Sequence, residues 1–172
     1  IILVFVTTLD GKVTKWGDPR VFGWSSKEDQ AYFKQVWNTY HLVIMGSGTY
    51  DDEPFKAPVN NRLIILTRDP LKYKDKEIPG NLEFTNETPS EIVERLKNEG
   101  ADEILLVGGP HLATSFFKED LVDEVWLTLE PKIFGSGGSF VVESKLDVNL
   151  RLLSSEKVNG QGTLINKYAV VK

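Results

Sequence analysis

The feature that most constrains the fold is an alternation of short, continuously apolar runs with segments of helical periodicity. The apolar runs cover residues 1–6, 42–45, 63–66 and 104–107, and residues 125–129 predict a further strand. Runs of this length that are rich in β-branched residues are typical of strands covered on both faces. Strands that alternate with helices join through right-handed crossovers into a parallel sheet with helices on both faces.

The segments between and after these runs complete the expected fold. Ser25 with Glu28 predicts a capping box before a helix, and Thr88-Pro89-Ser90-Glu91 predicts a second helix start. Residues 110–117 predict a further helix, and Asn159-Gly160 separates two extended runs as a hairpin signal. We therefore expect an α/β fold of three layers, with a mostly parallel central sheet, helices on both faces and an antiparallel C-terminal hairpin. No polar linker divides residues 1–172, so we expect a single domain.

Composition excludes several classes of function. The chain has 20 Lys and Arg against 25 Asp and Glu, a net charge of −5, which argues against a nucleic-acid binder. No apolar run reaches the length of a membrane span, so we expect no membrane partner. The chain has no Cys and only two His, so we expect no disulfide and no metal site. The start shows no signal-peptide pattern, and a cytoplasmic location is expected.

Two glycine-rich turns follow predicted strands, Gly46-Ser47-Gly48-Thr49 and Gly108-Gly109-Pro110-His111. Ligands of open α/β sheets bind beyond the carboxyl ends of the strands. Glycine lets the backbone approach a phosphate there, and free amides at a helix start attract the anion. Each turn alone could simply be a sharp turn, but two of them match the two halves of a dinucleotide. Neither is a GxGxxG fingerprint or a Walker motif with its lysine.

Asp29 is the candidate proton donor. It lies four positions before Phe33 on the first predicted helix, so the two share the face turned to the core. A carboxyl buried there beneath Trp24 would have a raised pKa from desolvation and could donate a proton. The alternative is that Asp29 caps the helix with Ser26, but Ser25 and Glu28 already satisfy the predicted cap and leave Asp29 free.

Several further motifs occur in a fixed order along residues 1–140. They are Thr8-Leu9-Asp10-Gly11-Lys12, Trp24-Ser25-Ser26 with Asp29 and Phe33, Val43-Ile44-Met45-Gly46 through Gly48-Thr49 to Glu53-Pro54, Val107-Gly108-Gly109-Pro110, Leu121-Val122-Asp123-Glu124 and Pro131-Lys132-Ile133-Phe134-Gly135. Taken together, the ordered motifs resemble the dihydrofolate reductase superfamily, and most closely its riboflavin-biosynthesis reductase branch, the RibD C-terminal domain.

The resemblance implies an NADPH-dependent reductase that forms a homodimer. Its nicotinamide would lie near Thr7, Thr8 and Gly108, and Arg68 would read the 2′-phosphate by bidentate donation, unless it is only an exposed arginine beside Asp69. The implied cofactor-binding residues are Gly46, Ser47, Gly48, Thr49, Thr67, Arg68, Gly108, Gly109, Pro110, His111 and Leu112. The implied substrate contacts are Thr8, Trp24, Phe33 and Glu53, and the implied catalytic residues are Asp29 and Asp10. Thr128 would fix Asp29 through a water, or serve only as a strand residue.

Two substrates and one non-catalytic function remain open. The Asp10-Gly11-Lys12 motif and residues 46–54 favour 5-amino-6-(5-phosphoribosylamino)uracil, although Val107 stands where that branch typically carries Glu. Dihydrofolate or another pterin is the alternative, but Asn61 stands at the position of the arginine that holds the folate carboxylate, and Arg62 lies one residue further on. Ser47 also replaces an arginine common in dihydrofolate reductases. A nucleotide-binding homologue without turnover is the third possibility.

Overall fold

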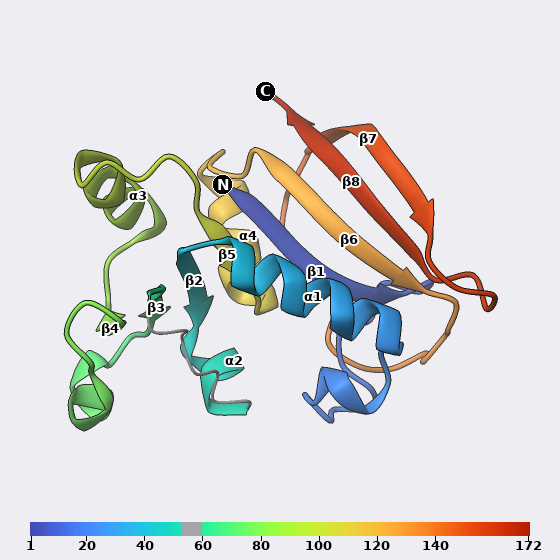
Figure 1. The fold of residues 1–172 in the computed structure, drawn as a ribbon, viewed down its shortest axis with the longest axis horizontal. Helices are drawn as coiled ribbons and strands as arrows, with labels where there is room; N and C mark the ends of the chain where they lie inside the picture. The colour runs from blue at the N-terminus through green and yellow to red at the C-terminus, as the bar shows by residue number, and fades with distance from the viewer. Residues whose placement is uncertain (53–59) are drawn as a thin grey trace.

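A single eight-stranded sheet organises the computed structural model, which describes residues 1–52 and 60–172 (Figure 1). The strand order is β4-β3-β2-β5-β1-β6-β8-β7, with every neighbouring pair parallel except β6–β8 and β8–β7. The strands are β1 (Ile2–Thr8), β2 (Leu42–Gly46), β3 (Arg62–Leu66), β4 (Leu82–Thr85), β5 (Leu105–Val107), β6 (Glu124–Glu130), β7 (Asn149–Lys157) and β8 (Leu164–Val171). The mostly parallel sheet and the antiparallel hairpin confirm the expected fold class.

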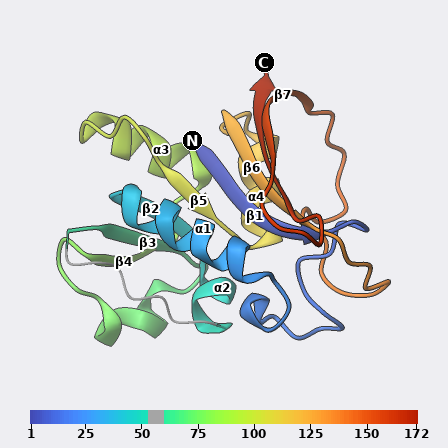
Figure 2. The same cartoon turned by 45° about the vertical axis from the view of Figure 1, so that its right-hand side comes forward.

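Helices cover both faces of this sheet (Figure 2). The α-helices are α1 (Lys27–Thr39), α2 (Ser47–Asp52), α3 (Pro89–Asn98) and α4 (Pro110–Lys118), and the 3-10 helices are η1 (Val21–Gly23) and η2 (Pro70–Lys76). None of the helices in the described part of the chain is long and apolar enough to cross a lipid bilayer.

Side chains that alternate along the central strands build one core on each face. Val4 of β1 belongs to a core that includes Val36 and Trp37 of α1. Leu3, one residue earlier, belongs to the opposite core, which includes Ile92 of α3 and Phe116 of α4. The strands are thus covered on both faces, which is why their sequences are continuously apolar.

The chain leaves β1 and β5 in opposite directions across the sheet. The β1–α1–β2 connection runs toward β4, whereas the β5–α4–β6 connection runs toward β7, on the other face. Adjacent parallel strands whose connections diverge in this way leave a crevice at their carboxyl ends, the position where α/β proteins bind ligands. The topology therefore places a site between the ends of β1 and β5.

The local sequence signals correctly predicted the start of α3. The Thr88 hydroxyl accepts from Glu91 N and the Glu91 carboxylate accepts from Thr88 N, so the predicted capping box is formed. The predicted hairpin also forms, with β7 paired to β8 on either side of residues 158–163. The prediction of a turn at residues 46–49 is wrong, because Gly46 ends β2 and residues 47–49 form the start of the short helix α2.

The start of α1 differs from the prediction by one residue. Ser26, not Ser25, is the N-cap, and its Oγ accepts a hydrogen bond from Asp29 N at 3.2 Å. The backbone N–H of Ser26 donates to the carboxylate of Glu130, 104 residues away, at 2.6 Å. This long-range contact, which no local pattern reveals, accompanies the shifted cap. The Asp29 side chain still remains free of the cap, because only its backbone takes part.

Candidate active site

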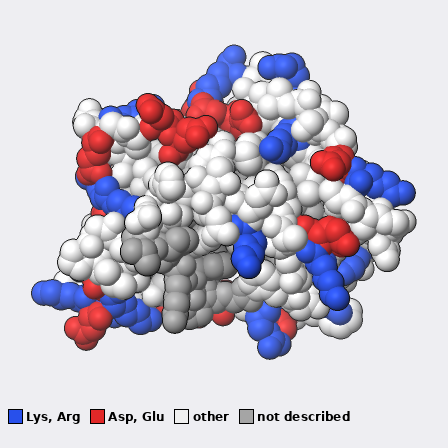
Figure 3. All heavy atoms as spheres, in the orientation of Figure 1, with Lys and Arg blue, Asp and Glu red and all other residues white. Residues whose placement is uncertain are grey.

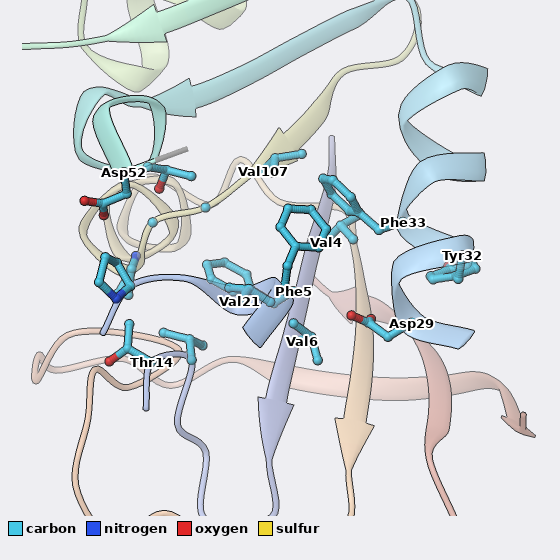
Figure 4. Close-up of a pocket in the computed structure, with 17 residues that line it drawn as sticks. Val4, Phe5, Val6, Thr14, Val21, Asp29, Tyr32, Phe33, Asp52 and Val107 are labelled. Carbon is cyan, nitrogen blue, oxygen red and sulfur yellow. The ribbon is translucent and has the colours of Figure 1, made fainter. Parts of the chain in front are cut away.

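A cavity of about 180 Å³ opens at the expected crevice (Figure 4). It lies between β1, the end of β5, α1, α2 and the loop that follows β1. The lining residues are mostly apolar and are Val4, Phe5, Val6, Val13, Thr14, Pro19, Val21, Phe22, Asp29, Tyr32, Phe33, Thr49, Asp52, Val107, Gly108, Gly109 and Pro110. An apolar cavity with a few polar groups is the usual form of a small-molecule site.

Asp29 supplies the buried acid of this cavity. It projects from α1 toward the strands (Figure 4), and its side chain is only 5% exposed. Burial raises the pKa of the carboxyl to about 6, and the charge of Glu130 acts in the same direction. Hydrogen bonds with the Thr128 and Ser25 side chains act against this rise. The carboxyl is therefore poised to exchange a proton near neutral pH.

Two buried polar side chains lie close to Asp29 in the sequence. Trp24 Nε1 and Tyr32 OH are buried and have no hydrogen-bond partner among the described residues. Trp24 packs its ring edge to face against Phe134, with the centroids 5.2 Å apart, and Tyr32 lines the cavity itself. Native proteins seldom leave buried donors unpaired. The Asp29 end of the cavity is therefore suited to a ligand with polar ring substituents.

Glu130 is a buried acid that the sequence reasoning missed. It is 1% exposed at the end of β6, two residues after Thr128 and on the same face of the strand. Because side chains alternate along a strand, an acid two positions after the residue assigned to Asp29 was a usable signal. Tyr32 and Asp52 were also missed, although both line the cavity.

The two glycine-containing segments, residues 46–49 and 108–111, lie against each other. Gly46 N donates to Gly108 O at 3.1 Å, which joins the end of β2 to the turn after β5. Thr49 of α2 fills the space beside the second turn: a Cβ on Gly109 would stand 3.1 Å from Thr49 Oγ1. Gly108 has φ +46°, a conformation that glycine adopts readily. The Gly108–Gly109 peptide bond is cis.

The start of α4 presents backbone amides at the rim of this pair of turns. Its N-cap is Gly109, which has no side chain to cap the helix, and Pro110 is the first residue. The first helical hydrogen bond runs from Ala113 N to Gly109 O, so the amides of His111 and Leu112 precede it. Such amides favour an anion. The missing side chains and the helix start together fit the phosphates of a dinucleotide.

Thr67 and Arg68 follow β3 at the same edge of the sheet. Thr67 N donates to Thr85 O, and Thr67 Oγ1 accepts from Asp69 N at 3.3 Å. Arg68 is exposed and forms no salt bridge with the residues that the structure describes. Its guanidinium is therefore available to a phosphate.

Asp10 and Thr8 lie outside the cavity lining. The Thr8 hydroxyl donates to Asp10 Oδ1 at 2.5 Å, and the Asp10 carboxylate also accepts from Phe134 N and Gly135 N. These hydrogen bonds lower the pKa of Asp10, the one from Thr8 most strongly. Asp10 thus fastens the loop after β1 to residues 134–135, and its catalytic role stays a prediction. Glu53 lies outside the described residues.

Asn61, which stands at the position of the arginine that holds the folate carboxylate, contacts the end of α1. Asn61 is buried, and its Nδ2 donates to Tyr40 O at 2.8 Å and to Trp37 O at 3.3 Å, at the end of α1. Arg62 pairs with Glu83 and Glu99 away from the cavity. Neither side chain lines the cavity, so neither supplies the carboxylate contact that a folate would need.

Comparison with solved structures identifies the class of fold. The chain is similar to dihydrofolate reductase from Enterococcus faecalis complexed with NADP(H), with 18% identity, a TM-score of 0.69, and coverage of 99% of this chain and 96% of that one. It is also similar to a diaminohydroxyphosphoribosylaminopyrimidine deaminase/5-amino-6-(5-phosphoribosylamino)uracil reductase from Thermotoga maritima. That match has 18% identity and a TM-score of 0.77, and covers 99% of this chain but 56% of that one. These matches show a dihydrofolate-reductase-like fold.

Sequence comparison then identifies the family. Residues 1–164 match the family model of the RibD C-terminal domain, and the chain belongs to this family. It is 28% identical over 166 residues to protein YwjB of Bacillus subtilis (strain 168), which covers 91% of this chain and 90% of that protein. The predicted family membership is confirmed.

Proposed function

We propose that this protein is a reductase that uses NADPH to reduce a small heterocycle, with 5-amino-6-(5-phosphoribosylamino)uracil as its substrate. The observation that carries the proposal is the single cavity wall that joins a buried acid, Asp29, to two adjoining glycine turns. Family membership and the reductase names of the structural neighbours support the same chemistry.

The backbone of the two turns would hold the cofactor. The amides of His111 and Leu112 would take one phosphate group, residues 46–49 the other, and Arg68 the 2′-phosphate. Bound NADPH supplies a hydride from the nicotinamide C4. Phe5, Val107 and the other apolar lining residues exclude water from the reacting atoms.

Asp29 would supply the proton. Reduction adds a hydride to C1 of the substrate's ribose, which has opened to a carbonyl or imine, and a proton to the oxygen or nitrogen of that double bond. A carboxyl with a pKa of about 6 holds a proton in part of the molecules near neutral pH. Among the described lining residues the charged side chains are Asp29 and Asp52, both acids. The substrate ring, with its N–H donors, therefore suits the Asp29 end, and its phosphate must point away from it.

Dihydrofolate or another pterin is the second candidate. It is favoured by the resemblance, which assigns Asp29 to the position of the acid that grips the pterin in dihydrofolate reductases. Thr128 hydrogen-bonds the Asp29 carboxyl in this chain. The engagement of Asn61 with α1 and of Arg62 with Glu83 weighs against a folate carboxylate at this site.

The test is the loss of NADPH absorbance with each of the two substrates, run side by side with a direct measurement of NADPH binding. We expect oxidation with the phosphoribosylamino-pyrimidine, and in Asp29→Asn a kcat lowered about 10²-fold or more with NADPH affinity unchanged. Oxidation with dihydrofolate alone would favour the pterin. Binding without turnover would indicate a nucleotide-binding homologue, and no NADPH binding would overturn the proposal.

A further inference from the structure

Glu130 is a fully buried carboxylate without a cationic partner. Its Oε1 accepts from Ser26 N at 2.6 Å, and its Oε2 accepts from the Thr163 hydroxyl at 2.9 Å. No Lys, Arg or His of the described residues forms a salt bridge with it. Burying a carboxylate in this way is costly, and an apolar residue at the end of β6 would avoid the cost. Stability alone therefore does not explain why an acid occupies this buried position.

The hydrogen bonds of Glu130 lead directly to Asp29. Ser26, whose N–H the Glu130 carboxylate accepts, is the N-cap of α1, and its Oγ accepts from Asp29 N. Thr128, which hydrogen-bonds the Asp29 side chain, lies two residues before Glu130 on the same face of β6. Both carboxyl groups thus lie beneath the first turn of α1. Like charges at close range disfavour ionisation, and Glu130 raises the pKa of Asp29 in addition to burial.

The turn between β7 and β8 supports this arrangement from the other side. Asn159 Nδ2 donates to Thr163 Oγ1 at 2.9 Å, and its Oδ1 accepts from the Thr163 backbone. Asn159 Nδ2 also reaches Glu28 on the first turn of α1, at 3.1 Å. The hairpin turn, β6 and α1 are therefore joined around Glu130.

The other ionisable groups near Asp29 do not place a buried charge next to its carboxyl. Glu28 is exposed on the solvent side of the same turn. The ammonium of Lys132 donates to the carbonyl of Trp24 rather than to either acid. The Tyr32 phenol lies on the cavity side, and burial raises its pKa, so it stays neutral.

We propose that Glu130 is a positioning residue, which fastens the first turn of α1 to β6 and to the 158–163 turn and keeps a negative charge beside the acid of the cavity. Its charge helps Asp29 to retain a proton, and its two hydrogen bonds hold Asp29 at the cavity wall. The consequence for catalysis rests on the proposed function, whereas the effect on the Asp29 proton does not.

The test compares Glu130→Gln with wild type. Glutamine keeps the shape and an acceptor oxygen but removes the charge. We expect the titration midpoint of Asp29, followed by carbon NMR of labelled carboxyl groups, to move toward acid by on the order of one pH unit. Glu28→Gln is the matched control, because it removes an exposed charge from the same turn, and we expect no such movement. An Asp29 midpoint that is the same in Glu130→Gln and wild type overturns the proposal.

Two further measurements keep the test decisive. If Glu130→Gln does not fold, the wild-type titration still tests the proposal: an Asp29 midpoint raised toward 6 supports it, and a midpoint at the ordinary value of 3.8 contradicts it. In the folded variant, the pH at which kcat falls by half should move toward acid together with Asp29, while the KM for NADPH stays unchanged. An NMR shift in a protein that oxidises no NADPH would support the role of Glu130 and reject the proposed function.

Discussion

At the scale of single residues, the buried Asp29 carboxyl should make stability depend on pH. Its pKa is raised from 3.8 to about 6, so it contributes stability that is complete below about pH 4 and is lost as the pH rises through 6. The loss by pH 7 is on the order of 3 kcal/mol. We predict that Asp29→Asn, neutral at every pH, has a higher free energy of unfolding than wild type at pH 7, with the difference vanishing near pH 4. Denaturant unfolding at a series of pH values measures it.

The difference in the free energy of unfolding between Asp29→Asn and wild type isolates the contribution of Asp29 from that of the other acids. Asp18 and Glu87, for example, have lowered pKa values because of hydrogen bonds to arginines, and they contribute the opposite trend to both proteins. The exposed Glu28 provides the comparison, since Glu28→Gln should not be stabilised at pH 7. A difference for Asp29→Asn that is flat between pH 4 and 7 would show that the carboxyl is not buried as described.

At the scale of elements, the end of α1 depends on one side chain of the segment before β3. Asn61 donates to the carbonyls of Trp37 and Tyr40 at the point where the helix ends. We predict that Asn61→Ala lowers the free energy of unfolding by about 1–3 kcal/mol, because buried carbonyls lose their donor. The exposed neighbour Asn60 is the matched control, and Asn60→Ala should change stability by less than about 0.5 kcal/mol.

The same pair of variants tests the position assigned to a folate carboxylate. If Asn61 acts only on α1, the KM for substrate stays unchanged in Asn61→Ala under conditions where the variant is fully folded. A large rise in KM without loss of stability would place Asn61 at the substrate instead.

At the scale of the whole molecule, the outer edge of the sheet offers a surface for a second copy of the chain. β7 is the last strand in the order and is exposed along its length, with Leu150, Leu152 and Leu153 44%, 53% and 45% exposed. Exposed apolar edge strands favour edge-to-edge pairing. On the face shown in Figure 3, basic and acidic side chains are interspersed. The homodimer stays a prediction. Because β7 is an exposed apolar edge strand, we expect the two chains to pair along it.

Light scattering coupled to size-exclusion chromatography measures the mass in solution. We expect the mass of two 19.4 kDa chains for wild type and of one chain for Leu152→Lys, because a lysine on an edge strand opposes pairing. Lys157→Arg, on the same strand, should remain a dimer. A wild-type monomer at all concentrations, or a Leu152→Lys dimer, would contradict the prediction.

Local signals account for what the sequence predicted well. The capping box of Thr88 and Glu91, the hairpin at Asn159-Gly160 and the strands of the core depend on neighbours within a few residues or on simple periodicity. The position of Asp29 on the cavity face of α1 followed from its spacing to Phe33 in the same way. The N-cap was wrong by one residue because Ser25 and Ser26 are equally good caps in isolation.

The sequence by itself determined the α/β class, the family, the glycine turn after β5 and an acid on the first helix, because periodicity, capping and short motifs act over a few residues. Only the tertiary structure decided that Glu130 binds the start of α1, the helix that carries Asp29, that Asp10 fastens two loops outside the cavity, and that Asn61 binds the end of α1. Those outcomes depend on contacts between segments as many as 125 residues apart, as in the bond from Gly135 N to Asp10. Burial, which sets the pKa of Asp29, arises only when such segments pack together.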